Sequence, residues 1–290
     1  MSLFLIILIQ ASFYSLLGLG YVLIYRATRV LNLAHGDLMV FGAYAFYQGL
    51  VFSGGNIWIA AGCSLISAYA LGVIIYQAIM RPLAGYPVAV GVLATIALGI
   101  LLRSLVTLVW SGQTRYPIEY FKDVAQPFSL PGGLTISGID ALIVVAAALA
   151  LVCIPWALQR LPVGIEMRGV AENPLLAAQR GINIHFINAQ SWAAAALIAA
   201  LAGVLYALKV RLGPDTWYVG LAGFAPALIG GMDSLRGVLF GAVIVAAAEV
   251  LAARYVAPQV AMAAPFLALL IGLWLRPWGL FGSHEELERI

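Results

Sequence analysis

Long apolar runs, each bounded by polar or turn-forming residues, dominate this chain of 290 residues. A helix needs about 20 residues to cross a hydrocarbon core about 30 Å thick, because each residue advances it by about 1.5 Å. Runs of that size lie at 3–25, 31–52, 56–80, 88–110, 139–158, 188–209, 236–255 and 257–275. The pattern predicts an all-α polytopic membrane protein with about eight or nine transmembrane helices, built as one transmembrane domain over residues 1–282 with a short tail at 283–290.

A further apolar run, 219–231, is too short to cross a bilayer alone. It contains Pro226 and the pair Gly230-Gly231, which interrupt helices. We expect a broken or half-spanning helix here, which lipid tolerates only where protein surrounds the freed backbone groups.

Composition excludes several classes of protein. Hydrophobic residues make up 63% of the chain and charged residues 9%, and the mean hydropathy is +1.01, which is too apolar for a soluble domain of this length. The net charge of +3 is spread over several loops and forms no basic stripe, so nucleic acid is not expected as a partner. Cys63 and Cys153 show neither metal-ligand nor disulfide spacing. The N-terminus lacks a basic region and a cleavage site, so we expect residues 1–25 to remain as the first span.

The distribution of basic residues predicts the orientation, because cytoplasmic loops are richer in Lys and Arg. We place the N-terminus outside and the C-terminus in the cytoplasm, with 219–231 crossing. The inner loops then hold Arg26, Arg29, Arg81, Arg160, Arg168, Arg180, Arg236, Arg276 and Arg289. The outer loops hold Arg115, Lys122, Lys209, Arg211 and Arg254.

Small residues recur at every fourth position in several runs, which is typical of closely packed transmembrane helices. The sets are Gly91, Thr95 and Gly99; Ser191, Ala195, Ala199, Gly203 and Ala207; and Gly237 with Gly241.

A polar stripe interrupts the second run. Asn32, His35, Gly36 and Met39 follow the i, i+3, i+4, i+7 spacing of one helical face. Polar groups at membrane depth are candidates for function, so the stripe predicts either a translocation path or a polar helix interface.

Two charges lie deep in apolar runs. Arg103 and Glu249 fall at similar depths if both helices run from inside to outside, and an unpaired charge at that depth is costly. We expect them to meet each other or to share a polar network, with a structural or a functional purpose. Asp37 also belongs to this set, and we expect it to meet Arg26 or Arg29 near the inner surface.

The inner loop, about 160–186, carries a full set of helix signals. Asn173 suits an N-cap, Pro174 the first helical position and Gly181 a left-handed C-cap around a helix over 175–180. Such a short helix needs a supporting surface, either the chain's own inner face or a cytoplasmic partner. The outer loop, about 111–138, suits a lid or a docking place for a soluble partner, and Ser283 with Glu286 predicts a short helix in the tail.

The sequence offers no convincing set of active-site residues for an enzyme. His35 and Asp37 are two apart and diverge on a helix, and no nucleophile, metal cluster or P-loop accompanies them. We therefore expect no catalytic residues, no metal and no cofactor bound by this chain, so any ATP-driven work must come from another polypeptide.

Five motifs in one order resemble the LivH-type permeases of ABC importers for branched-chain amino acids and related solutes. They are Asn-Leu-Ala-His-Gly-Asp at 32–37 with Phe-Gly-Ala-Tyr at 41–44, Met-Arg-Pro-Leu at 80–83, Met-Arg-Gly-Val-Ala-Glu-Asn at 167–173, Leu-Ile-Gly-Gly-Met-Asp-Ser at 228–234, and Arg-Pro-Trp-Gly-Leu-Phe-Gly at 276–282. The chain departs from the family pattern at Asp233 and Arg236, which add charge to an inner turn.

The resemblance implies a permease of the bacterial inner membrane that works by alternating access. Its partners would be two ATPase subunits that bind the ATP, a second permease chain (LivM-like or a copy of this one) and an external solute-binding protein. The ATPase-coupling segment would be 168–181, with Arg168, Glu172, Asn173, Pro174 and Gly181. The solute itself stays open among branched-chain amino acids, urea, short amides and aromatic acids.

Two other functions compete with this interpretation. An ion-coupled secondary transporter or channel would use Asp37, Glu249 and His35 for coupling. A membrane-embedded hydrolase built on His35 and Asp37 is disfavoured by their spacing.

Overall fold

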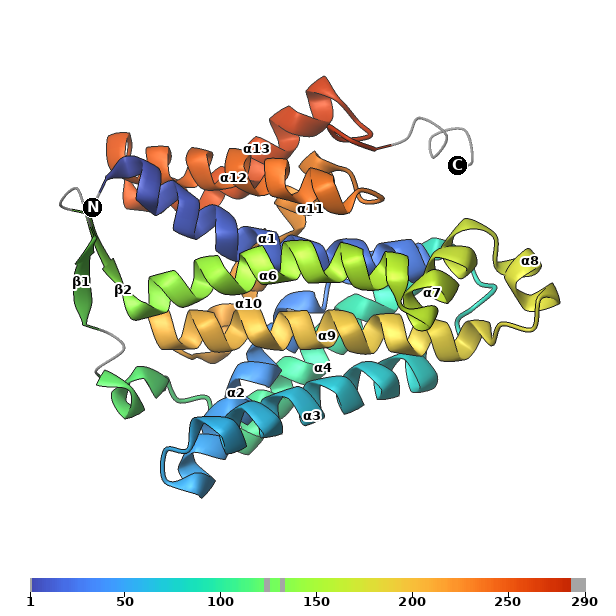
Figure 1. The fold of residues 1–290 in the computed structure, drawn as a ribbon, viewed down its shortest axis with the longest axis horizontal. Coiled ribbons are helices and arrows are strands. Elements are labelled where there is room, and N and C mark those ends of the chain that lie inside the picture. Colours follow the sequence, from blue (N-terminus) through green and yellow to red (C-terminus); the bar gives the residue numbers. More distant parts are fainter. Residues whose placement is uncertain (1, 123–125, 131–133, 283–290) are drawn as a thin grey trace. The chain divides into compact units, whose positions relative to one another are not determined.

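The computed structural model describes residues 2–122, 126–130 and 134–282, and helices dominate it (Figure 1). The helical elements are α1 (Leu3–Thr28), α2 (His35–Ser53), α3 (Ile57–Ile75), η1 (Tyr76–Met80), α4 (Val88–Trp110), η2 (Pro117–Tyr120), α6 (Gly138–Arg160), α7 (Pro162–Glu172), α8 (Pro174–Gln179), α9 (Ile184–Lys209), η3 (Pro214–Thr216), α10 (Trp217–Ala222), α11 (Phe224–Gly230), α12 (Leu235–Tyr255) and α13 (Pro258–Leu275). The predicted all-α class is confirmed.

Seven helices of the described residues are long and apolar enough to cross a membrane. They are α1, α3 continued by η1, α4, α6, α9, α12 and α13. The prediction of a span over 31–52 was wrong in its start, because the chain there becomes helical only at His35. The resulting helix, α2, carries several polar residues and does not belong to the seven.

The run 219–231 is interrupted, as predicted, but the break falls at Gly223 and not at Pro226 or Gly230-Gly231. It forms α10 and α11, of 6 and 7 residues, which are separated at Gly223. Pro226 falls in the first turn of α11, where the missing N–H has no intrahelical partner to lose. Each piece is far too short to cross a bilayer, so the crossing of this segment stays a prediction.

The loop at about 111–138, which was predicted to lie outside, holds structure that the sequence did not predict. Within the described residues, a two-stranded antiparallel hairpin pairs β1 (Pro127–Leu130) with β2 (Leu134–Ser137), in the register Pro127 opposite Ser137. The predicted helix at Ser283 lies outside the described residues, as does the rest of the tail.

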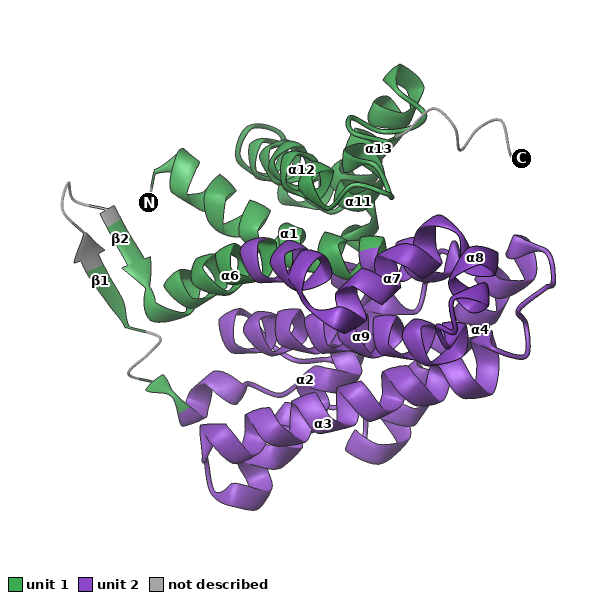
Figure 2. Cartoon of the chain, turned by 45° about the vertical axis from the view of Figure 1, so that its right-hand side comes forward, with its two compact units in different colours: residues 1–22, 121–151, 222–290 green, residues 23–120, 152–221 purple. Residues whose placement is uncertain are grey.

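The chain divides into two compact units, coloured separately in Figure 2. Unit 1 comprises residues 1–22, 121–151 and 222–290, and unit 2 comprises 23–120 and 152–221. The expectation of one permease domain over 1–282 stays a prediction.

Close packing at small residues holds each unit together. In unit 2, Gly42 of α2 and Gly72 of α3 lie against the backbone of α9 at Ala200 and Ala193, so a side chain at either glycine would collide. In unit 1, α11 packs against α12 backbone to backbone, with Gly230 against Gly237. The small-residue pattern at 237–241 thus marks a real helix contact.

Candidate functional site

A non-helical segment, residues 30–34, separates α1 from α2 and runs along α4. Arg29 ends α1 in the left-handed region, with φ at 56°, and the backbone then follows the small-residue face of α4. Val30 lies against Gly91, and Thr95 Oγ1 accepts a hydrogen bond from the Leu33 N–H at 3.1 Å. The backbone of residues 30–34 therefore packs directly on the small-residue face of α4. Thr95 hydrogen-bonds to one of the amide groups that lack a helical partner between α1 and α2.

The polar stripe predicted over the second run is only partly helical. Asn32 precedes α2, and its Oδ1 accepts from the Ala34 N–H at 3.1 Å, so it cannot share a helical face with His35. This part of the prediction was wrong because the side chain of Asn32 bonds locally to the backbone in place of a helical turn.

The remaining stripe residues are buried at contacts between helices of unit 2. His35 is fully buried, at 0% exposure. Gly36 contacts the backbone of Trp217 in α10, and the carbonyl of Met39 contacts Gly203 of α9. Both contacts are so close that a Cβ at Gly36 or at Gly203 would collide with the neighbouring backbone. These contacts are those of a helix interface, and a place on the translocation path stays a prediction.

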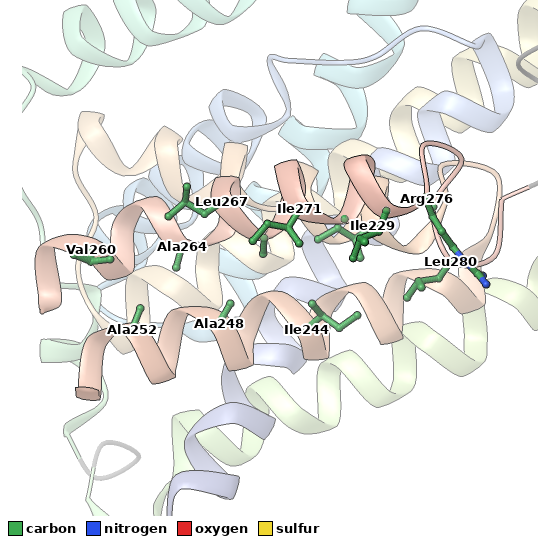
Figure 3. Close-up of a pocket in the computed structure, with 14 residues that line it drawn as sticks. Ile229, Ile244, Ala248, Ala252, Val260, Ala264, Leu267, Ile271, Arg276 and Leu280 are labelled. Carbon is green, nitrogen blue, oxygen red and sulfur yellow. The ribbon is translucent and has the colours of Figure 1, made fainter. Parts of the chain in front are cut away.

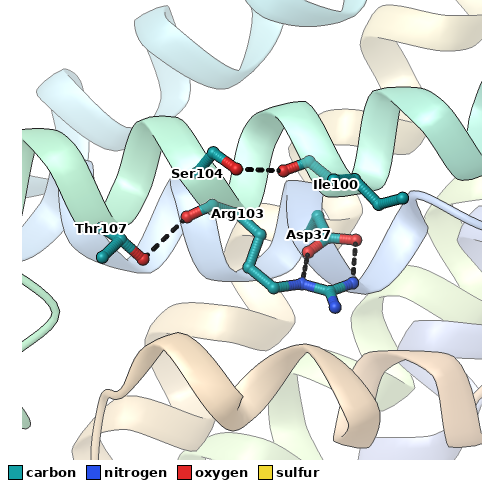
Figure 4. A network of polar contacts seen from close by, with 5 residues as sticks. All are labelled: Asp37, Ile100, Arg103, Ser104 and Thr107. Atoms are coloured by element: carbon teal, nitrogen blue, oxygen red, sulfur yellow. Dashed lines mark hydrogen bonds and ion pairs between the residues drawn. The ribbon is translucent and has the colours of Figure 1, made fainter.

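Asp37 forms an ion pair with Arg103, as Figure 4 shows. Arg103 Nε donates to Asp37 Oδ1 at 3.1 Å and Nη2 donates to Oδ2 at 3.3 Å. The guanidinium also stacks over the indole of Trp217, with its central carbon 3.7 Å from the ring centroid. Gly99 leaves room for the carboxylate, because a Cβ there would lie 2.6 Å from Asp37 Oδ2. One buried carboxylate thus joins α2, α4 and α10 through a single arginine.

Glu249 is bound differently, by two neutral groups of α1. Tyr14 Oη donates to Glu249 Oε2 at 2.6 Å, and Gln10 Nε2 donates to the same oxygen at 3.0 Å. All three residues belong to unit 1.

Both predicted pairings were therefore wrong: Arg103 with Glu249, and Asp37 with Arg26 or Arg29. Depth along a helix axis gives the level of a side chain, but it does not give the direction in which the side chain points or the helix that it meets. Gln10 is the one amide in the first apolar run and was a usable signal for the Glu249 contact. Trp217 gave no signal in the sequence.

The predicted inner-loop helix is present as α8. Asn173 Oδ1 accepts from the Leu176 N–H at 3.0 Å, Pro174 occupies the first helical position, and Gly181 has φ at 83°. The sequence did not predict the preceding helix, α7, and α9 begins at Ile184, earlier than expected.

One side of this helix pair is anchored and the other is open. Ala177 is buried with Val170 and Ile187 in a small apolar cluster. Leu175 and Leu176 are 71% and 57% exposed, and the other predicted coupling residues, Arg168, Glu172, Asn173, Pro174 and Gly181, are exposed around them. We call the exposed pair Leu175 and Leu176 the knob. Charged residues surround it, and the buried cluster at Ala177 anchors its inner side.

An apolar groove of about 730 Å³ lies between α12 and α13 in unit 1 (Figure 3). Alanines of both helices line it, and Arg276 is its one charged lining residue. It lacks the few convergent polar groups that orient a small polar solute, so we do not assign it to solute binding.

Metal chemistry finds no support in the described ranges. Within them, no group of three or more His, Cys, Asp or Glu side chains is placed to hold a metal ion. Cys63 and Cys153 are both free and exposed. That the chain binds no cofactor of its own stays an expectation.

Comparison with known proteins gives the same family along nearly the whole chain. The family model described as the branched-chain amino acid transport system permease component matches residues 3–275. The high-affinity branched-chain amino acid transport system permease proteins LivH of Escherichia coli (strain K12) and BraD of Pseudomonas aeruginosa are each 27% identical, over 96% of this chain and 94% of the relative. A probable LivH from Methanocaldococcus jannaschii is 26% identical over 98% of this chain and 93% of its own.

The fold is shared with known structures. One example is PsaBC from Streptococcus pneumoniae in complex with Fab, which matches with a TM-score of 0.51 and 15% identity over 99% of this chain and 96% of that chain.

Proposed function

The chain belongs to the family of branched-chain amino acid transport system permease components, and from that premise we propose that it carries branched-chain amino acids or closely related amino acids and amides across the bacterial inner membrane. It is a multi-pass membrane protein and a transport subunit. The curated relatives named above are all permeases of branched-chain amino acid transport, which favours this class of solute. The transport cycle is alternating access driven by ATP on partner subunits.

The observation that carries the proposal is the exposed knob on α8. A helix of 6 residues is marginal in water, yet this one has a capped start and an anchored inner side. Exposed leucines ringed by charge suit insertion into a groove of another protein. We assign that groove to the ATPase, so residues 168–181 transmit its closure to the spans.

The full importer comprises two such ATPases, a second permease chain and an external solute-binding protein. The second permease is a LivM-like chain or a copy of this one.

We propose that the N-terminus lies outside and the C-terminus in the cytoplasm, because this choice places more Arg and Lys in the inner loops. Contacts within unit 2 support the grouping of these loops by side. The backbones of Arg115 and Leu212, both assigned outside, pair through two hydrogen bonds of 2.8 and 2.9 Å. Segments assigned inside, at 26–30, 83–88 and 170–174, line one pocket of about 270 Å³. Loops assigned to one side therefore meet each other.

The test is coupling in the complete importer, reconstituted in vesicles with leucine as the solute. Asn173→Ala removes the cap of α8, which stabilises a helix by about 1 kcal/mol, and Glu172→Lys reverses the charge beside the knob. We expect both variants to hydrolyse ATP while importing less leucine per ATP, with normal insertion. Asn183→Ala is the matched control, since Asn183 caps α9 in the same way, on the Phe186 N–H at 3.1 Å, but outside the knob.

The rival ion-coupled mechanism gives opposite results in the same vesicles. Leucine uptake driven by an imposed proton or sodium gradient without ATP would refute the proposal. Normal coupling in both knob variants would refute the role of residues 168–181.

A further inference from the structure

Arg103 lies far inside an apolar helix, α4, where a charged side chain that faced lipid would cost free energy. It is fifteen residues beyond the start of α4 and seven before its end, which places it about 22 Å and about 10 Å from the two ends of the helix. Its side chain is nevertheless 33% exposed in this chain. Charged groups at such depth face a protein interior or a water-filled pathway, so we expect this face of α4 to border something other than lipid.

The contacts of Arg103 fix its guanidinium in one orientation. Nε and Nη2 are both used by Asp37, and Trp217 covers one face of the group. Nη1 takes no part in the ion pair and is turned away from Asp37 (Figure 4). Asp37 is only 3% exposed, so a solute can reach the arginine of this pair but not the carboxylate.

The surroundings of Arg103 supply acceptors and apolar surface. An open groove of about 450 Å³ is lined by Ile100, Arg103, Ser104, Thr107 and Leu108. Both hydroxyls already donate within the helix, Ser104 to the Ile100 carbonyl and Thr107 to the Arg103 carbonyl, each at 2.9 Å (Figure 4). Their remaining lone pairs can only accept hydrogen bonds. The groove therefore offers a donor and two acceptors, with apolar side chains around them.

We propose that this groove is a transient subsite for a zwitterionic amino acid on its way through the importer. The carboxylate of the solute accepts from Arg103 Nη1, its ammonium group donates to Ser104 and Thr107, and its apolar side chain rests on Ile100 or Leu108. This assignment rests on the proposed function. Because Asp37 already neutralises the arginine, the subsite binds weakly, as a site that must also release its solute requires.

The first test uses the complete importer in vesicles, with leucine as the probe. Arg103→Lys keeps a positive charge for Asp37 but removes the free guanidinium nitrogen, and we expect leucine imported per ATP to fall roughly tenfold, as for the loss of one charged hydrogen bond. Ser104→Ala combined with Thr107→Val leaves the ion pair intact and should lower the same ratio less. Arg254→Lys, an exposed arginine at the end of α12, is the matched control. Unchanged ratios in both sets of groove variants would overturn the subsite.

The second test does not depend on transport. Thr107→Cys is placed in a background with Cys63→Ser and Cys153→Ser, and the assembled importer is treated with anionic and cationic methanethiosulfonate reagents. We expect both to react, the anionic one several-fold faster, and leucine-loaded binding protein with ATP to slow the reaction. Absence of reaction with either reagent means that lipid or another chain covers the groove, and it overturns the subsite. Failure of the unaltered importer to move leucine would instead refute the proposed function, while the labelling still reports on the groove.

Discussion

Asp37 and Glu249 pose the same physical problem and are bound in opposite ways. Asp37 is buried in the first turn of α2, Glu249 is half-buried within α12, and the two lie in different compact units. Asp37 is held by the charged fork of Arg103, whereas Glu249 accepts from two neutral donors, Gln10 and Tyr14. The first arrangement ties the stability of unit 2 to a pair of charges, and the second leaves unit 1 with a local hydrogen-bonded contact between α1 and α12.

Breaking the Asp37 pair should have the largest effect. Arg103→Leu leaves a buried carboxylate with no counter-charge, and removing one partner of a buried pair costs about 3–5 kcal/mol. We expect low yield and a lower unfolding temperature of the purified complex in detergent. The double variant Arg103→Leu with Asp37→Leu removes both charges and should recover most of the stability. A double variant as unstable as the single one would show that the pair matters for packing rather than for charge.

The backbone around Asp37 should tolerate added volume poorly. Gly36→Ala places a methyl group against the Trp217 carbonyl, and overpacking of this kind costs about 1–3 kcal/mol. Gly62→Ala in α3 is the control, since nothing lies within 4 Å of a Cβ there. Alanine at that position should be neutral or stabilising by up to about 1 kcal/mol, because it is the better helix former. Equal unfolding temperatures for the two variants would contradict the close approach of α2 and α10.

Isosteric neutralisation separates the two carboxylates most directly. Glu249→Gln keeps an oxygen that accepts from Tyr14 and Gln10, so we expect a cost below about 1 kcal/mol. Asp37→Asn keeps the shape but leaves the charge of Arg103 uncompensated, and should cost several times more. The two variants are compared by thermal unfolding of the same complex. Similar costs would mean that Glu249 also depends on its charge.

The all-α class and the seven long apolar helices could be predicted from the sequence because each apolar run carries its own signal, whereas the run that contains α2 is too polar to be counted with them. The α8 helix was equally accessible, since Asn173, Pro174 and Gly181 act on neighbouring backbone. Residues 31–34 were assigned to a helix because hydropathy reports burial and does not report whether the backbone is helical. Thr95, which supports the break, lies over sixty residues away in the chain.

The partners of the buried charges could not be predicted for a related reason. Similar depth suggested Arg103 and Glu249, but the pairing depends on which helices adjoin and on how each is rotated about its axis. The small-residue face of α4 was identified correctly, and only the structure shows that Asp37 fits beside its Gly99. Contacts between residues near in sequence can be predicted from short stretches of the chain, whereas the rotation of each helix is set by packing against all of its neighbours.

A third carboxylate, Asp215, extends the comparison to water and should have the smallest effect. It pairs with Arg211 outside the spans, with Arg211 Nη1 3.0 Å from Asp215 Oδ1, and it is 53% exposed. The hydrogen bond from Arg211 holds the pKa of Asp215 below its ordinary value of 3.8. The stabilisation by this pair is therefore complete above that value and is lost as the pH falls through the lowered pKa.

We expect Asp215→Asn to cost less than about 1 kcal/mol at pH 7, as for other exposed pairs. The difference in unfolding temperature from the unaltered protein should vanish in strong acid or in about 1 M salt, which shortens the screening length to about 3 Å. The cost of Arg103→Leu should persist in the same salt, because Asp37 is buried, and loss of both effects together would show that water reaches Asp37 as freely as it reaches Asp215.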